Sequence, residues 1–166
     1  MSLLTNALEG QFLFYAGHDE KAIVRLRKSL ELDPTFWIAH GILGRVYTGQ
    51  GRYDEAIDEF RKAIEFGGSA NEPITQLAYA LAKSGRREEA KATLEELKIS
   101  ATKSYVPAYN FAVIYNGLGD KEQALKYLEK SFQEREVQIT FIKIDTRWNE
   151  IHDEVHFQNL MRRLGF

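Results

Sequence analysis

The chain has 166 residues, of which 44% are apolar and 28% charged, and its formal net charge is −2 at pH 7. This balance is typical of a globular protein and gives no sign of the basic field that attracts nucleic acid or an anionic membrane. The absence of cysteine excludes disulfides, thiolate zinc sites and cysteine nucleophiles, and no apolar run approaches the roughly 20 residues of a membrane span. We therefore expect no nucleic-acid or membrane partner, and a cytoplasmic protein.

A glycine followed five residues later by an alanine recurs along the chain at intervals of 34 residues. The pairs are Gly17 and Ala22, Gly51 and Ala56, Gly85 and Ala90, and Gly119 and Ala124. Between them, apolar residues recur at spacings of three and four, which predicts helices. Each unit is therefore expected to be two helices joined by a tight turn. The glycine ends the first helix in a backbone conformation with positive φ, and the alanine lies where the two helices cross.

The predicted elements follow one another in chain order as four helical pairs and a different ending. The pairs are expected at about residues 3–34, 35–68, 69–102 and 103–135, and the ending covers residues 136–166. Acidic residues follow the turn in each pair, where the dipole at the start of the second helix favours negative charge. The glycine and alanine are thus predicted to have an architectural role.

The second unit carries the clearest motif. His40 occupies a slot that is usually tryptophan, and it is followed in register by Leu43, Gly44, Tyr47, Gly51, Tyr53, Ala56, Phe60 and Ala63. This pattern resembles the tetratricopeptide repeat (TPR), and the resemblance covers about residues 3–134. It implies an all-α, right-handed superhelix of about four helix-turn-helix repeats. The RNA-binding pentatricopeptide array usually has a 35-residue period and a basic surface, and neither is found here.

From Glu136 the 34-residue period lapses. The ending resembles a C-terminal segment that follows TPRs in many bacterial signalling proteins, such as nucleotide cyclases, protein kinases and winged-helix regulators. Asp145, Trp148 and Phe157 fit that pattern, although both of its prolines are missing. We expect short amphipathic helices, including Val155, that cover the apolar face of the last repeat, with Trp148 as their anchor.

No group of residues indicates catalysis. His152 and His156 are four residues apart, but "HDEVH" is not the zincin motif, and only Asp153 is nearby as a further ligand. His40 is expected to be packed inside the protein. The glycines end helices and form no phosphate-binding loop. We therefore expect no enzyme, no cofactor and no bound metal.

The resemblance implies that the first helix of each pair lines a concave groove. The residues predicted to bind a partner there are Gln11, Tyr15, Ile38, Ile42, Arg45, Gln76, Tyr79, Lys83, Tyr109, Asn110, Val113 and Asn116. Aromatic and amide side chains suit an extended peptide or a protein partner. Tyr15, Tyr79 and Tyr109 are expected to be partly exposed, whereas Ile38, Ile42 and Val113 have the alternative of packing between repeats. The spaced cations and amides by which some TPR co-chaperones clamp an acidic C-terminal tail are not recognisable.

Two further functions remain open beside partner binding in the groove. Apolar residues surround most of the first predicted helix, among them Leu4, Leu8 and Phe12. A terminal repeat normally keeps a polar outer face, so this helix predicts either an upstream neighbour or self-assembly into a homodimer. The third alternative is an accessory or regulatory subunit of an enzyme that acts on a small molecule.

Overall fold

The protein is described by a computed structural model of residues 2–67 and 70–166, and these residues form helices and connecting turns without a strand. The helices are α1 (Leu3–Tyr15), α2 (Asp19–Leu32), α3 (Trp37–Gly49), α4 (Tyr53–Gly67), α5 (Asn71–Lys83), α6 (Arg87–Ala101), α7 (Ala108–Gly117) and α8 (Lys121–Gln133), followed by the 3₁₀ helices η1 (Val137–Phe141) and η2 (Thr146–Ile151) and by α9 (Val155–Arg163). The boundary expected at residues 68 and 69 lies outside the described residues.

The repeated glycines end the first helix of every pair, as predicted. Gly17, Gly51, Gly85 and Gly119 have φ values of 74°, 72°, 87° and 76°. Only glycine adopts this left-handed conformation without a steric cost, because any Cβ would crowd the backbone. Acidic residues follow in the first turn of α2, α4, α6 and α8. The same local sequence pattern, a glycine followed by acidic residues, therefore produces the same tight turn in each of the four repeats.

Close packing within each pair depends on small residues. Ala22, Ala56, Ala90 and Ala124 are all completely buried, which confirms their predicted place inside the helical pair. In the second pair, Gly44 of α3 faces the ring of Phe60 on α4, and an added Cβ would lie only 2.6 Å from ring atom Cε1. The absence of a side chain at Gly44 thus lets the two helices approach.

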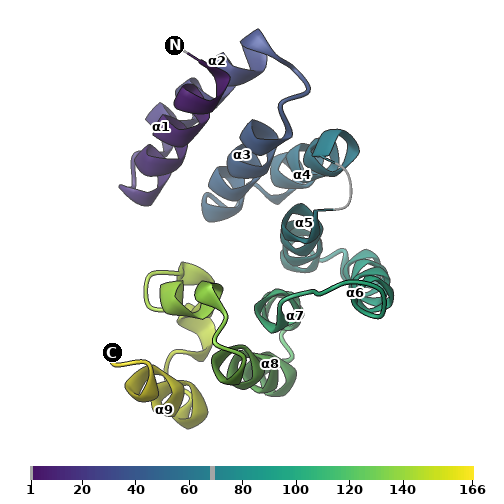
Figure 1. Ribbon diagram of the computed structural model, residues 1–166, viewed down its shortest axis with the longest axis vertical. Helices are drawn as coiled ribbons and strands as arrows, with labels where there is room; N and C mark the ends of the chain where they lie inside the picture. The colour runs from purple at the N-terminus through teal and green to yellow at the C-terminus, as the bar shows by residue number, and fades with distance from the viewer. Residues whose placement is uncertain (1, 68–69) are drawn as a thin grey trace.

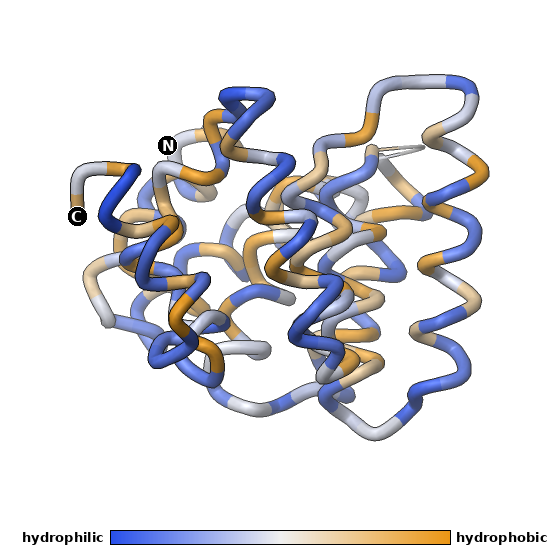
Figure 2. The backbone as a smooth tube through the Cα atoms, turned by 90° about the horizontal axis from the view of Figure 1, so that it is seen from below, coloured by the Kyte–Doolittle hydropathy of each residue, from blue (hydrophilic) through white to orange (hydrophobic). Residues whose placement is uncertain are grey.

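The four pairs form a curved array (Figure 1). The first helices α1, α3, α5 and α7 lie along the inner side of the curve, and α4, α6 and α8 lie outside. Apolar and polar residues alternate along the helices in Figure 2, because each helix buries one face between its neighbours. The fold is a TPR-like superhelix with a helical ending at its C-terminus.

The C-terminal segment folds back onto the inner side of the curve, where Figure 1 shows η1 and η2 beside α7 and α8. Trp148, Ile151 and Phe157 are each 1% exposed and share one hydrophobic cluster with residues of α5, α7 and α8. The predicted anchoring role of Trp148 is confirmed. Val155 departs from the prediction, because it is the first residue of α9 and points away from the cluster into solvent.

Candidate partner-binding face

The concave face has a covered part and an open part. Helices α5 and α7 line the covered part, over which the segment containing η1 and η2 lies. Helices α1 and α3 line the open part. The division decides which predicted residues are accessible to a partner.

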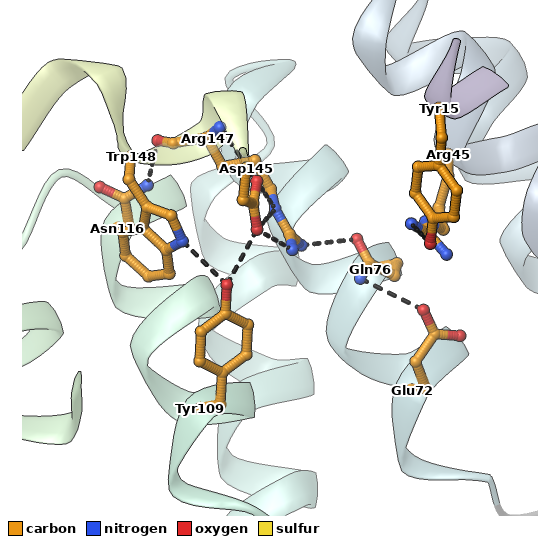
Figure 3. A network of polar contacts seen from close by, with 9 residues as sticks. All are labelled: Tyr15, Arg45, Glu72, Gln76, Tyr109, Asn116, Asp145, Arg147 and Trp148. Carbon is orange, nitrogen blue, oxygen red and sulfur yellow. Dashed lines mark hydrogen bonds and ion pairs between the residues drawn. The ribbon is translucent and has the colours of Figure 1, made fainter. Parts of the chain in front are cut away.

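In the covered part, Tyr109 of α7 is the centre of a buried polar network (Figure 3). Its hydroxyl donates to the carboxylate of Asp145 at 2.9 Å and accepts from the indole Nε1 of Trp148, also at 2.9 Å. The Asp145 carboxylate in turn accepts from Nε of Arg147 at 2.8 Å. Tyr109 of the repeats and Arg147 of the C-terminal segment therefore hold the carboxylate of Asp145 against the inner face.

Three more predicted groove residues hold the same segment. The side-chain amide of Asn116 donates to the backbone carbonyl of Arg147 at 2.7 Å, and Gln76 accepts from Arg147 Nη1 at 3.0 Å. Lys83 forms an ion pair with Glu150 at 2.6 Å. The chain itself thus uses these side chains in the way expected for a peptide partner, by bonding both main-chain and side-chain groups.

Burial and charge pairing shape the protonation of this network. Burial alone would raise the pKa of Asp145, but the charge and hydrogen bonds of Arg147 hold this pKa below its ordinary value. Burial alone would lower the pKa of Arg147, and Asp145 raises it above its usual range. The pKa values of Tyr79 and Tyr109 are raised, chiefly by burial. The pair is therefore charged, both tyrosines remain neutral, and Tyr109 acts as a neutral hydrogen-bonding group.

The predicted partial exposure of Tyr79 and Tyr109 is wrong. Each is 6% exposed, because both belong to the cluster that joins the repeats to the C-terminal segment. Val113 is 1% exposed in the same cluster, and Asn110 is also buried. Periodicity places these residues on the inner face, but it does not show that a distant part of the chain covers that face.

Sequence reasoning did not identify Glu136 as a residue of this face. Its carboxylate accepts from the backbone N–H groups of Ala108 and Tyr109 at 2.6 and 2.9 Å, and from the Tyr105 hydroxyl at 2.7 Å. It therefore caps the N-terminus of α7 from 28 residues away. Burial alone would raise the pKa of Glu136, but the neighbouring Ser131 side chain and these hydrogen bonds lower it. Nothing local in the sequence marks this long-range contact.

The open part presents polar donors from α1 and α3. Tyr15 is 57% exposed, and its hydroxyl accepts from Arg45 Nη2 at 2.9 Å and from Gln11 Nε2 at 3.3 Å. The Arg45 guanidinium also lies 5.4 Å from the centre of the Tyr15 ring. Ile42 belongs to the buried core, and Ile38 is partly buried against that core. Both residues therefore follow the alternative prediction, in which they pack between repeats.

The outer surface of α1 is apolar. Leu4, Leu8 and Phe12 are exposed, and Phe12 reaches 70%. Leu8, Phe12 and Leu13 line a shallow hollow on this surface. The apolar helix predicted from the sequence is therefore present and uncovered in a single chain.

Metal-binding groups do not gather within residues 2–67 and 70–166. Histidine, aspartate and glutamate form no cluster there that is suited to a metal ion. His40 is buried, as predicted, with Nδ1 2.5 Å from Glu59 and Nε2 2.9 Å from the carbonyl oxygen of Pro34. No helix in the described part of the chain has the length and apolar character to cross a membrane.

Comparison with known proteins agrees with the helical pairs. A tetratricopeptide repeat profile matches residues 16–141, which is most of the chain. The chain belongs to the tetratricopeptide repeat family. It is also similar to the human N-alpha-acetyltransferase 16, NatA auxiliary subunit, with 26% identity over 162 residues. That match covers 96% of this chain and 18% of the human protein, so the chain spans less than a fifth of its relative's length.

Proposed function

We propose that this TPR protein is a non-catalytic scaffold that binds an extended peptide or a protein partner on the open part of its concave face. The supporting observation is the way in which the chain's own C-terminal segment docks. Tyr109, Asn116 and Gln76 of α5 and α7 form hydrogen bonds with Asp145 and with Arg147 of η2. The inner face thus has the chemistry to hold a polypeptide. The part lined by α1 and α3 keeps Gln11, Tyr15 and Arg45 available.

A photo-crosslinking experiment tests this proposal. Benzoylphenylalanine placed at Tyr15 keeps an aromatic side chain on the inner face, and the same residue at Ile99 serves as a matched control. Ile99 is also exposed, at 59%, but it lies on the outer helix α6. We expect partner polypeptides from the native lysate to be captured from position 15 and not from position 99. Capture from position 99 alone, or from neither position, would refute the proposal.

The human relative suggests in what setting such a scaffold acts. That protein is named as an auxiliary subunit of an acetyltransferase. By analogy, the partner proposed here includes an enzyme that the scaffold accompanies without catalysing the reaction itself. Co-purification of the native protein with one enzyme at constant stoichiometry is the expected result.

The C-terminal pattern supports a second setting, a bacterial signalling protein of the cytoplasm. Asp145 and Trp148, which carry the resemblance, are residues that attach this segment to the repeats. The residues that carry the resemblance thus have a structural role in this chain. A genomic sequence that joins this chain to a cyclase, kinase or winged-helix domain is the expected finding, and a gene that encodes only an unrelated domain beside it would count against this setting.

Self-assembly through α1 is the second candidate function, and the exposed Leu4, Leu8 and Phe12 favour it. An uncovered apolar face of this kind is typical of an interface. Phe12→Ser should then convert a dimer into a monomer in sedimentation velocity, while the melting temperature of the repeats stays unchanged. A wild-type chain that stays monomeric at high concentration would exclude this function.

A further inference from the structure

We propose that the open part of the concave face recognises an acidic side chain of the bound polypeptide, and that Arg45, Tyr15 and Gln11 form the subsite. This inference rests on the proposed scaffold function and names the chemistry of its partner. The chemistry of the subsite depends on which hydrogen-bonding groups of these three residues are already used.

Donors outnumber acceptors in this subsite, where the amide oxygen of Gln11 is the one acceptor that the two hydrogen bonds within it leave over. The Tyr15 oxygen accepts from Arg45 and Gln11, so its own O–H hydrogen remains available to donate. A guanidinium carries five N–H groups, and only one donates to Tyr15. Within the described residues, Arg45 forms no ion pair with a carboxylate. A partner that fits this subsite must therefore supply acceptors and negative charge, as a carboxylate does.

The covered part of the same face shows how this chain holds a carboxylate. Asp145 lies between the hydroxyl of Tyr109 and the guanidinium of Arg147, at 2.9 and 2.8 Å. Tyr15 and Arg45 provide the same two kinds of donor, and Figure 3 shows them on the other side of Gln76 from that site. In the covered part the arginine belongs to the C-terminal segment, whereas in the open part the repeats supply both the tyrosine and the arginine, and no carboxylate of the described residues pairs with Arg45.

Among the described residues of α5 and η2, both cations have a carboxylate partner, whereas Arg45 on α3 has none. Lys83 is paired with Glu150, and Arg147 with Asp145. Glu72 on α5 accepts a hydrogen bond from Gln76 at 3.3 Å and forms no ion pair with Arg45. Complementary charge therefore favours an acidic residue of the partner opposite Arg45.

The exposure of the subsite selects a polypeptide over a small anion. Tyr15 is more than half exposed, so a lone carboxylate would remain largely in water, where a single ion pair adds little affinity. Further contacts along the face between α1, α3 and α5 are needed to hold the ligand. A polypeptide makes them, as Asp145 and the 3₁₀ helix η2 do on the covered part.

Peptide selection tests the inference with the full chain. A random peptide library is displayed on phage and selected against the immobilised protein, and the selected peptides are synthesised and titrated by fluorescence anisotropy. We expect enrichment in Asp and Glu. Arg45→Gln should weaken binding about tenfold, because a charged hydrogen bond is lost. Arg61→Gln is the control, since Arg61 is half exposed on the outer helix α4.

A second variant tests the same subsite with a smaller change to the side chain, so that a loss of binding is not confused with a loss of the fold. Tyr15→Phe removes one exposed hydroxyl and should weaken binding roughly threefold. Both variants should keep the circular dichroism and melting temperature of the wild type, and added salt should weaken binding of the acidic peptides.

The outcomes separate this inference from the scaffold proposal. Peptides that crosslink to position 15 but lack acidic residues, or bind Arg45→Gln and Tyr15→Phe normally, overturn the acidic subsite and leave the scaffold function standing. Equal weakening by Arg61→Gln shows nonspecific charge attraction and also overturns the subsite. If no peptide is selected, or peptides crosslink only to position 99, both proposals fail.

Discussion

Two glycines of α3, three residues apart, should respond in opposite ways to the same substitution. At Gly44, an added Cβ would lie 2.6, 2.7 and 2.9 Å from three ring atoms of Phe60, whose side chain is completely buried. At Gly41, an added Cβ would meet no atom within 4 Å, and its backbone is helical without a positive φ. The two sites therefore differ in packing and share the same local conformation.

The expected magnitudes follow from two opposing effects. Alanine in place of glycine within a helix stabilises the folded state by about 0.5–1 kcal/mol. At Gly44, forcing a methyl group against Phe60 costs about 1–3 kcal/mol, because the buried ring has no free space to move into. Gly41→Ala should thus raise the free energy of unfolding by up to about 1 kcal/mol. Gly44→Ala should lower it by about 1–2 kcal/mol.

Thermal unfolding followed by circular dichroism measures both effects. For a chain of this length, 1 kcal/mol corresponds to about 2–4 °C in melting temperature. We expect Gly41→Ala to melt a few degrees above the wild type and Gly44→Ala a few degrees below it. Equal shifts of the same sign would show that helix propensity alone sets the change in stability. Such a result would refute the packing explanation for Gly44.

Two further predictions concern the attachment of the C-terminal segment. Asp145→Ala leaves the largely buried Arg147 without its carboxylate, so the free energy of unfolding in urea should fall by about 3–5 kcal/mol, and an unchanged midpoint would contradict the proposed pairing. Asp145 and Glu136 both have folded-state pKa values below their ordinary values of 3.8 and 4.5. Their stabilisation is therefore complete above about pH 4.5 and is lost as the pH falls through the lowered values. Melting temperatures measured down a pH series should decline in this acid range, and Asp145→Asn should make the decline shallower.

The sequence by itself was sufficient for the repeating architecture. Gly51 needs a left-handed backbone and Ala56 a close helix crossing, and both requirements act within one helical pair. Such local requirements recur at a fixed spacing and are readable without coordinates. The sequence also predicted Trp148 as the anchor of the C-terminal segment and Phe12 on an apolar helix. For the same reason, the inner-face positions of Tyr79 and Tyr109 were predictable from their register.

Only the tertiary structure decided what covers that inner face. The burial of Tyr79 and Tyr109, the capping of α7 by Glu136 and the pairing of Gln76 with Arg147 all join residues far apart in the chain. Periodicity reports which side of a helix a residue occupies, because it arises from contacts within and between neighbouring helices. It carries no information on where a nonrepeating segment folds back. The C-terminal segment packs against α5 and α7 and covers that part of the inner face. Gln11, Tyr15 and Arg45 therefore remain in the open part.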